Sequence, residues 1–159
     1  MKTKVSILMG SKSDLDIMNK AVEMLKKFGI DYDINVLSAH RTPHEAIAFV
    51  ENSDSDLFIA GAGGAAHLPG VVAGITTKPV IGVPIKASIS IAGIDSLLSI
   101  VQMPPGVPVA TVGVDGAKNA GILAAQILGV SNQDVHQKLV DFKIEQKEMV
   151  LESNNALVR

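Results

Sequence analysis

The stretch VSILMGSKSD, residues 5–14, decides the fold of this 159-residue chain. Its apolar run ends at Gly10, which predicts a short strand over residues 5–9 and then a turn. A helix is expected over residues 13–28, because charged residues take one face and apolar residues recur on the other at steps of three and four. Those apolar positions are Leu15, Met18, Val22 and Leu25. The chain thus opens with a strand followed by a helix.

The same order of elements repeats to the end of the chain. Further strands are predicted at residues 32–37, 57–60, 79–83 and 109–112. Further helices are predicted at residues 43–52, just before residue 74, and at residues 95–101, 117–128 and 132–154. Strands that alternate with helices form a parallel sheet with helices on both faces. We expect one α/β domain over residues 1–159, a three-layer α/β/α sandwich with a central parallel sheet, plus a C-terminal helix.

Local signals mark where some helices begin. The tetrapeptide TPHE at residues 42–45 has a capping-box pattern with proline at the first helical position. Ser131 is expected to cap the last helix. The apolar stripe on that helix consists of Val135, Leu139, Phe142 and Met149. The longest irregular segment, residues 84–94, is a candidate lid or interface loop.

Composition excludes several classes of protein. The chain has no cysteine, so disulfides, thiolate metal sites and cysteine nucleophiles are excluded, and a reducing cytoplasm fits best. Its 14 Lys and Arg against 16 Asp and Glu give a net charge of −2. Charges this evenly balanced argue against electrostatic binding to the phosphate backbone of a nucleic acid duplex. One Tyr, four Phe and no Trp supply few platforms for base stacking. Nucleic acid is therefore not an expected partner.

Hydrophobicity predicts a soluble protein without a targeting signal, which associates with copies of itself. The apolar run at the N-terminus is too short for a signal peptide, and no stretch of about 18 apolar residues could span a membrane. Charged residues make up only 19% of the chain, against about 25% in a typical domain. We expect part of the excess apolar surface to lie in subunit contacts.

Three loops that follow predicted strands carry the functional signal. They are GSKSD at residues 10–14, SAHRTP at residues 38–43 and GAGGAAHLPG at residues 61–70. In an open parallel sheet, ligands bind beyond the carboxyl ends of the strands, near the point where strand order reverses. We expect the three loops to meet there.

The first two loops suit a phosphorylated ligand. Ser11 and Ser13 follow Gly10 at a helix N-terminus, where free N–H groups and the helix dipole favour an anion, although a simple N-cap has the same pattern. His40 can move protons near neutral pH and Arg41 can bind phosphate through two donors, although structural His-Arg pairs are also common.

The third loop is lined mainly by backbone. His67 is its only sizeable polar side chain. Glycine and alanine let a planar or small, gas-like ligand approach the main chain in a dry, narrow pocket. A tight strand-to-helix turn would explain the same residues.

Competing motifs fail on their spacing. Residues 61–66 match G-x-G-x-x-A, but no acidic ribose ligand stands among residues 81–86, so a nicotinamide cofactor is not expected. No G-x-x-x-x-G-K-[ST] motif occurs, which argues against a nucleoside triphosphatase. A helix begins between His40 and His44, so no shared metal is expected. His44 and His136 are expected on the surface.

The three loops together resemble the N5-carboxyaminoimidazole ribonucleotide mutases of bacterial de novo purine synthesis. The matching segments are MGSKSD (9–14), VLSAHRTP (36–43), AGAGGAAHLPG (60–70), DSLLSIVQMPPGVPVATV (95–112) and AKNAGILAAQILG (117–129). The resemblance covers residues 5–129. Two segments depart from the family pattern: residues 86–93 are one residue longer, and GVDG at 113–116 replaces a more apolar turn.

The resemblance implies a cofactor-free isomerase that moves a carboxylate from the exocyclic nitrogen of an aminoimidazole ribonucleotide to ring carbon C4. His40 would carry the proton, while Ser11, Ser13 and Arg41 suit the phosphate and Asp14 the ribose. The other expected substrate-binding residues are Ser38, Ala39, Gly63, Gly64, His67 and Leu68. The resemblance also suggests a homo-octamer, in which neighbouring chains help to wall the pocket.

Two alternatives stay open on the sequence. One is an aminoimidazole ribonucleotide carboxylase that uses free CO₂. The other is a binding module for a nucleotide or flavin, because the expected fold is flavodoxin-like and has the same phosphate loop. The scarcity of Trp and Tyr argues against a flavin.

Overall fold

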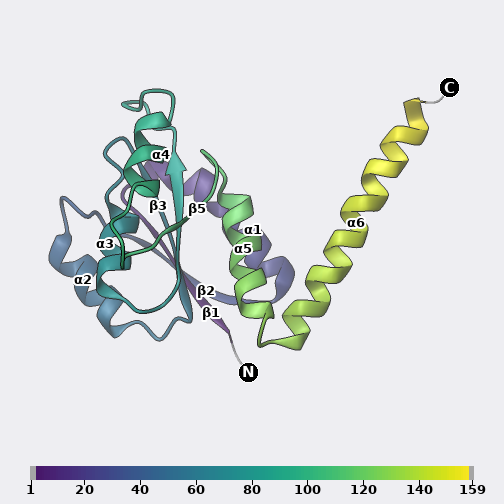
Figure 1. Ribbon diagram of the computed structural model, residues 1–159, viewed down its shortest axis with the longest axis horizontal. Coiled ribbons are helices and arrows are strands. Elements are labelled where there is room, and N and C mark those ends of the chain that lie inside the picture. The colour runs from purple at the N-terminus through teal and green to yellow at the C-terminus, as the bar shows by residue number, and fades with distance from the viewer. Residues whose placement is uncertain (1–2, 158–159) are drawn as a thin grey trace.

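The computed structural model describes residues 3–157, which form a five-stranded sheet with helices on both sides (Figure 1). The strands are β1 (Lys4–Met9), β2 (Asp31–Val36), β3 (Leu57–Gly63), β4 (Val80–Ile85) and β5 (Ala110–Thr111). The helices are a 3-10 turn η1 (Lys12–Asp14), then α1 (Leu15–Phe28), α2 (Pro43–Asn52), α3 (Leu68–Ile75), α4 (Ile94–Val101), α5 (Ala117–Gly129) and α6 (Gln133–Leu157). Within this described part, no helix is both long enough and apolar enough to cross a membrane.

The sheet is parallel throughout, with the strand order β2-β1-β3-β4-β5. The strands end close to one another, because Met9 pairs with both Val36 and Gly61, and Gly63 pairs with Ile85. Strand order reverses between β1 and β3, which is where open sheets of this kind bind ligands. The three-layer, flavodoxin-like α/β fold expected from the sequence is confirmed.

Alternation along the strands divides the core into two layers. Ile7 and Met9 belong to the cluster that contains α1 and α5, whereas Leu8 between them belongs to the cluster that contains α2, α3 and α4. Figure 1 shows these two groups of helices on opposite sides of the sheet. The contact between α1 and α5 is close: a methyl group at Gly121 would lie 2.8 Å from the carbonyl oxygen of Ala21. The two helices therefore pack as one unit.

Only the first half of α6 packs on the body of the protein. Val135 and Phe142 are buried. The rings of Phe142 and Phe28 pack edge to face, with their centroids 5.5 Å apart. Leu139 packs beside them. Met149, the last member of the expected stripe, is 57% exposed, because α6 runs away from the sheet in its second half (Figure 1).

Several element boundaries differ from those expected. The third strand continues three residues beyond Ala60, because Gly61, Ala62 and Gly63 still pair with β4, and the fourth continues through Ile85. The irregular loop expected at 84–94 therefore begins at Lys86. The fifth strand pairs only over Ala110 and Thr111, opposite Ile81 and Gly82.

Two expected helix caps are wrong in their details. Thr42 makes no side-chain cap to α2, because its Oγ1 accepts from the N–H of Ser38 at 2.8 Å and donates to the carbonyl of Ser38. The cap of α6 is Asn132 rather than Ser131. Its Oδ1 accepts from the N–H groups of Asp134 and Val135, and an asparagine caps as well as a serine.

Candidate active site

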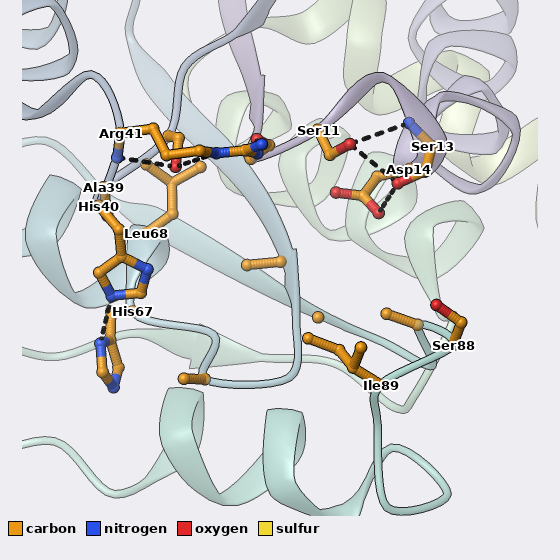
Figure 2. Close-up of a pocket in the computed structure, with 16 residues that line it drawn as sticks. Ser11, Ser13, Asp14, Ala39, His40, Arg41, His67, Leu68, Ser88 and Ile89 are labelled. Carbon is orange, nitrogen blue, oxygen red and sulfur yellow. Dashed lines mark hydrogen bonds between the residues drawn. The ribbon is translucent and has the colours of Figure 1, made fainter.

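A cavity of about 370 Å³ lies at the carboxyl ends of the strands, at the point where strand order reverses. Loops from four strands line it (Figure 2). The lining residues are Gly10, Ser11, Ser13 and Asp14 after β1; Ser38, Ala39, His40 and Arg41 after β2; Ala62, Gly63, Ala65, His67 and Leu68 from β3 onward; and Ala87, Ser88 and Ile89 after β4. The three loops singled out in the sequence therefore meet, as predicted.

Ten of the eleven site residues named from the sequence line this cavity, and Gly64 does not. Gly64 is buried at a φ of +63°, and a methyl group there would lie 2.9 Å from Cδ1 of Ile89. It supports the lining instead of forming it. Sequence reasoning missed the residues after β4 as part of the site, although it marked that segment as a candidate lid. The signal was available, because every parallel strand ends at the same edge.

The turn after β1 presents two hydroxyls and a buried carboxyl. Ser11 has extended backbone and caps η1, with its Oγ accepting from the N–H of Ser13 at 3.3 Å and from the Ser13 hydroxyl at 3.0 Å. The Ser13 hydroxyl also lies 3.3 Å from Oδ1 of Asp14. These hydroxyls, at the start of a helix, suit an oxyanion.

Asp14 is only 5% exposed. Its burial raises the pKa of the carboxyl above the usual value, and donation by Ser13 and the positive charge of Arg41 offset part of that rise. A desolvated carboxyl that faces a pocket opposes folding at neutral pH and is typical of a functional site. The same carboxyl can accept hydrogen bonds from hydroxyl groups of a ligand.

Arg41 ties the loop after β2 to the turn after β1. Its Nη2 donates to the carbonyl of Gly10 at 2.7 Å, and its Nε and backbone N–H both donate to Oγ of Ser38 at 3.4 and 3.2 Å. These bonds hold the guanidinium next to the Ser11 turn (Figure 2). A positive charge and two serine hydroxyls therefore converge at one end of the cavity.

His40 and His67 form a hydrogen-bonded pair that the sequence analysis did not predict. Nε2 of His40 lies 2.8 Å from Nδ1 of His67, and the rings meet edge to face at 79° with centroids 4.9 Å apart. The two residues come from different loops, after β2 and after β3, and both are exposed. Figure 2 shows the pair across the cavity from Ser88 and Ile89. A single proton can be shared between the two facing nitrogens.

Backbone and short side chains form the part of the cavity between these polar groups. A methyl group at Gly63 would lie 2.6 Å from Cβ of Ala87, so only glycine fits there. Ala62 and Ala65 line the same region. Such a surface allows a small or planar ligand to approach the main chain closely, as expected from the sequence. His44 and His136 are exposed on α2 and α6 and do not line the cavity, as expected.

Known proteins resemble this chain in both sequence and structure. The family model described as AIR carboxylase matches residues 4–149. The N5-carboxyaminoimidazole ribonucleotide mutase of Thermotoga maritima is 54% identical over 97% of this chain and 91% of its own length. The chloroplastic phosphoribosylaminoimidazole carboxylase of Vigna aconitifolia is 48% identical over 98% of this chain, but over only 28% of its own length. The crystal structure of Treponema denticola PurE has a TM-score of 0.87 and 32% identity, and the match covers 99% of this chain and 100% of that one.

Proposed function

The chain belongs to the AIR carboxylase family, AIR being aminoimidazole ribonucleotide, and from that premise we propose that it is the mutase of purine biosynthesis. It is an isomerase that converts N5-carboxyaminoimidazole ribonucleotide into 4-carboxy-5-aminoimidazole ribonucleotide. The Thermotoga maritima mutase matches this chain along nearly the whole length of both proteins, whereas the plant carboxylase is a much longer protein. The mutase is therefore the better model for a chain of this size.

The substrate's ribose phosphate fits the polar end of the cavity. Ser11, Ser13 and Arg41 are proposed to bind the 5′-phosphate, because two hydroxyls and a guanidinium converge there. Asp14 is proposed to accept hydrogen bonds from the ribose hydroxyls. This placement directs the imidazole ring toward the region lined by glycine and alanine.

The reaction exchanges one N–C bond for one C–C bond. The bond between the exocyclic nitrogen and the carboxylate breaks, which releases CO₂ and leaves its electron pair on nitrogen. Carbon C4 then attacks CO₂ and loses its proton as the nitrogen gains one, so atoms and charge balance. CO₂ is proposed to be held beside Gly63, in the region that Ala62 and Ala65 line, where short side chains leave room for a small ligand. The scheme calls for no metal and no cofactor.

The His40–His67 pair is the observation that carries this proposal. The reaction needs one group that can accept the proton from C4 and supply one to nitrogen near neutral pH, which suits histidine. His40 is proposed as that proton carrier, because it is adjacent to Arg41 in the loop and faces the cavity. His67 is proposed to orient His40 through the 2.8 Å bond and to share its proton.

The test compares two sources of the carboxylate. Purified protein is given the N5-carboxy substrate in buffer with ¹³C-bicarbonate, and in parallel AIR with the same bicarbonate. We expect rapid formation of the 4-carboxy product from the first substrate, without ¹³C, because CO₂ stays in the cavity. Rapid formation of labelled product from AIR would contradict the mutase and identify a carboxylase that uses free CO₂.

We also infer that the chain acts as a closed homo-octamer. The second half of α6 carries apolar side chains into solvent, among them Ile144, Met149 and Leu151, each at least half exposed. Exposed apolar surface of this kind is typical of subunit contacts, and closed symmetry satisfies such contacts on every chain. His40, His67 and Ile89 stand exposed at the cavity, where a neighbouring chain would complete its wall.

Light scattering at micromolar concentration measures the assembly directly, and a fully active monomer would contradict the octamer.

The cytoplasm is the proposed location, because the chain contains no cysteine and its substrate is a phosphorylated intermediate.

A further inference from the structure

The turn between β5 and α5 supports one side of the cavity without lining it. This turn, residues 113–116, is closed by a hydrogen bond from the N–H of Gly116 to the carbonyl of Gly113 at 2.9 Å. It contacts the segment between β4 and α4, residues 86–93, which we term the β4 loop. Three residues of the β4 loop line the cavity, namely Ala87, Ser88 and Ile89.

Asp115 continues the pairing of β4 after β5 has ended. The last backbone bond of that pairing runs from the N–H of Val112 to the carbonyl of Gly82 at 3.1 Å. The N–H of Asp115 then donates to the carbonyl of Pro84 at 2.8 Å, and its Oδ1 accepts from the N–H of Lys86 at 2.9 Å. One side chain therefore binds the first residue of the β4 loop and fixes the exit direction of β4.

The backbone conformation of Asp115 is one that glycine adopts more easily than aspartate. Its φ is +56°, in the left-handed region, where glycine would be less strained. Aspartate and asparagine tolerate this conformation better than other side chains. Such strain persists only where the surrounding contacts fix the residue. What the position gains over glycine is the carboxylate that binds Lys86.

The same turn also contacts the far end of the β4 loop. Gly93 has a φ of +84°, and a methyl group there would lie 2.6 Å from Cγ1 of Val114. The middle of the loop is held by Ser90, whose hydroxyl donates to Asp95 at 2.6 Å. Both ends of the loop therefore rest on a turn that leads directly into α5, which is packed closely against α1.

The position of the β4 loop sets the width of the cavity. Cβ of Ala87 lies against the backbone of Gly63, and the side chain of Ile89 lies over Gly64. Ser88 and Ile89 stand across the cavity from His40 and His67 (Figure 2). Movement of the loop away from Gly63 would widen the space in which the imidazole ring meets the histidines.

We propose, on the basis of the mutase function above, that Asp115 is a positioning residue: it holds residues 87–89 where they press the imidazole ring of the substrate toward His40. It touches neither the substrate nor the reacting atoms. Its effect passes through the N–H of Lys86 to the adjacent Ala87.

Two substitutions at this position separate the hydrogen bond from the backbone conformation. Asp115→Gly keeps the positive φ and loses the acceptor, whereas Asp115→Asn keeps both, because its carboxamide oxygen can accept the same N–H. For Asp115→Gly we expect kcat to fall by about 10- to 100-fold, since a displacement of about 1 Å far from the chemistry can cost about 10² in rate. The calorimetric affinity for AIR should remain near that of the wild type, because Ser11 and Arg41 belong to other loops. Asp115→Asn should restore most of kcat.

Hydrogen exchange at the amide of Lys86 gives a readout that does not depend on the reaction. Protection should be lost in Asp115→Gly and kept in Asp115→Asn. Wild-type kcat in the glycine variant, or an asparagine variant as slow as the glycine variant, would overturn the proposal. A lower melting temperature with unchanged kcat would show a merely structural role and would overturn it as well. If the wild-type protein failed to convert the N5-carboxy substrate, the proposed function would fail, while exchange at Lys86 would still decide whether the bond holds the loop.

Discussion

Replacement of Gly63 by alanine should show how closely the cavity is fitted to its ligand. The added methyl group would lie 2.6 Å from Cβ of Ala87 and 3.0 Å from the carbonyl oxygen of Ile85. Ordinary carbon–carbon contact is about 3.5–4.0 Å, so the backbone at Ala87 has to retreat by about 1 Å. The group that must move is bound to the main chain, which cannot relieve the contact by changing a rotamer.

Both stability and turnover should fall in Gly63→Ala. Overpacking of this kind costs about 1–3 kcal/mol. For a domain of this size each kcal/mol corresponds to about 2–4 °C, so the melting temperature should drop by about 2–12 °C. Turnover should fall by about 10²-fold, because the wall opposite His40 is displaced by about 1 Å.

A double-mutant cycle tests the cause. Ala87→Gly removes the atom that the new methyl group would meet, so Gly63→Ala with Ala87→Gly should recover most of the lost turnover. Gly74→Ala is the matched control, because its added methyl group meets nothing within 4 Å; it should keep full turnover and gain up to about 1 kcal/mol in stability. Thermal melts and steady-state kinetics on the four variants measure all of this. Wild-type turnover in Gly63→Ala, or no recovery in the double variant, would show that the contact between residues 63 and 87 does not set the width of the cavity.

Three further substitutions examine the polar groups of the cavity. His40→Asn should keep AIR affinity within a few-fold and lower turnover by about 10²–10⁴, the usual contribution of a positioned acid–base group; near-wild-type kinetics would move the role to His67. Arg41→Ala should weaken ribonucleotide binding by about 1.5–3 kcal/mol, the contribution of a charge-assisted hydrogen bond, and unchanged calorimetric affinity would discard the phosphate assignment. Asp14→Asn should raise the melting temperature at pH 7. This gain over the wild type should disappear near pH 3. Burial raises the pKa of Asp14 in the folded state, so its contribution to stability is present below the unfolded pKa and lost as pH rises through the folded pKa. A melting temperature that is lower at pH 7, or a gain that persists at pH 3, would contradict this.

Local signals in the sequence were enough to predict the site's main loops. The Gly10 turn, the His40-Arg41 dipeptide and the glycine-rich segment each follow a strand that the sequence predicts. Parallel strands bring such segments to one edge whatever the details of packing. The positive φ of Gly29 after α1 likewise follows from its place at the end of an amphipathic pattern.

Contacts between distant segments could not be predicted in this way. The bond between His40 and His67 depends on the relative height of β1, β2 and β3, and on the direction in which two loops leave them. The bond between Asp115 and Lys86 exists because β5 ends early, and nothing local to residues 109–112 indicates that end. Choosing Asn132 over Ser131 as a cap required the exact start of α6, since both residue types cap equally well.

The close contact between α1 and α5 has a consequence during synthesis on the ribosome. The buried face of α1, which includes Met18, Ala21 and Leu25, is covered by α5, whose last residue is Gly129. About 100 residues separate the ends of the two helices, so at about 5–20 residues per second α1 waits about 5–20 s for its partner. Throughout that interval the nascent chain exposes an apolar helix face and unpaired strand edges. Chaperone binding to the nascent chain should therefore begin as α1 leaves the ribosome and end when α5 has emerged.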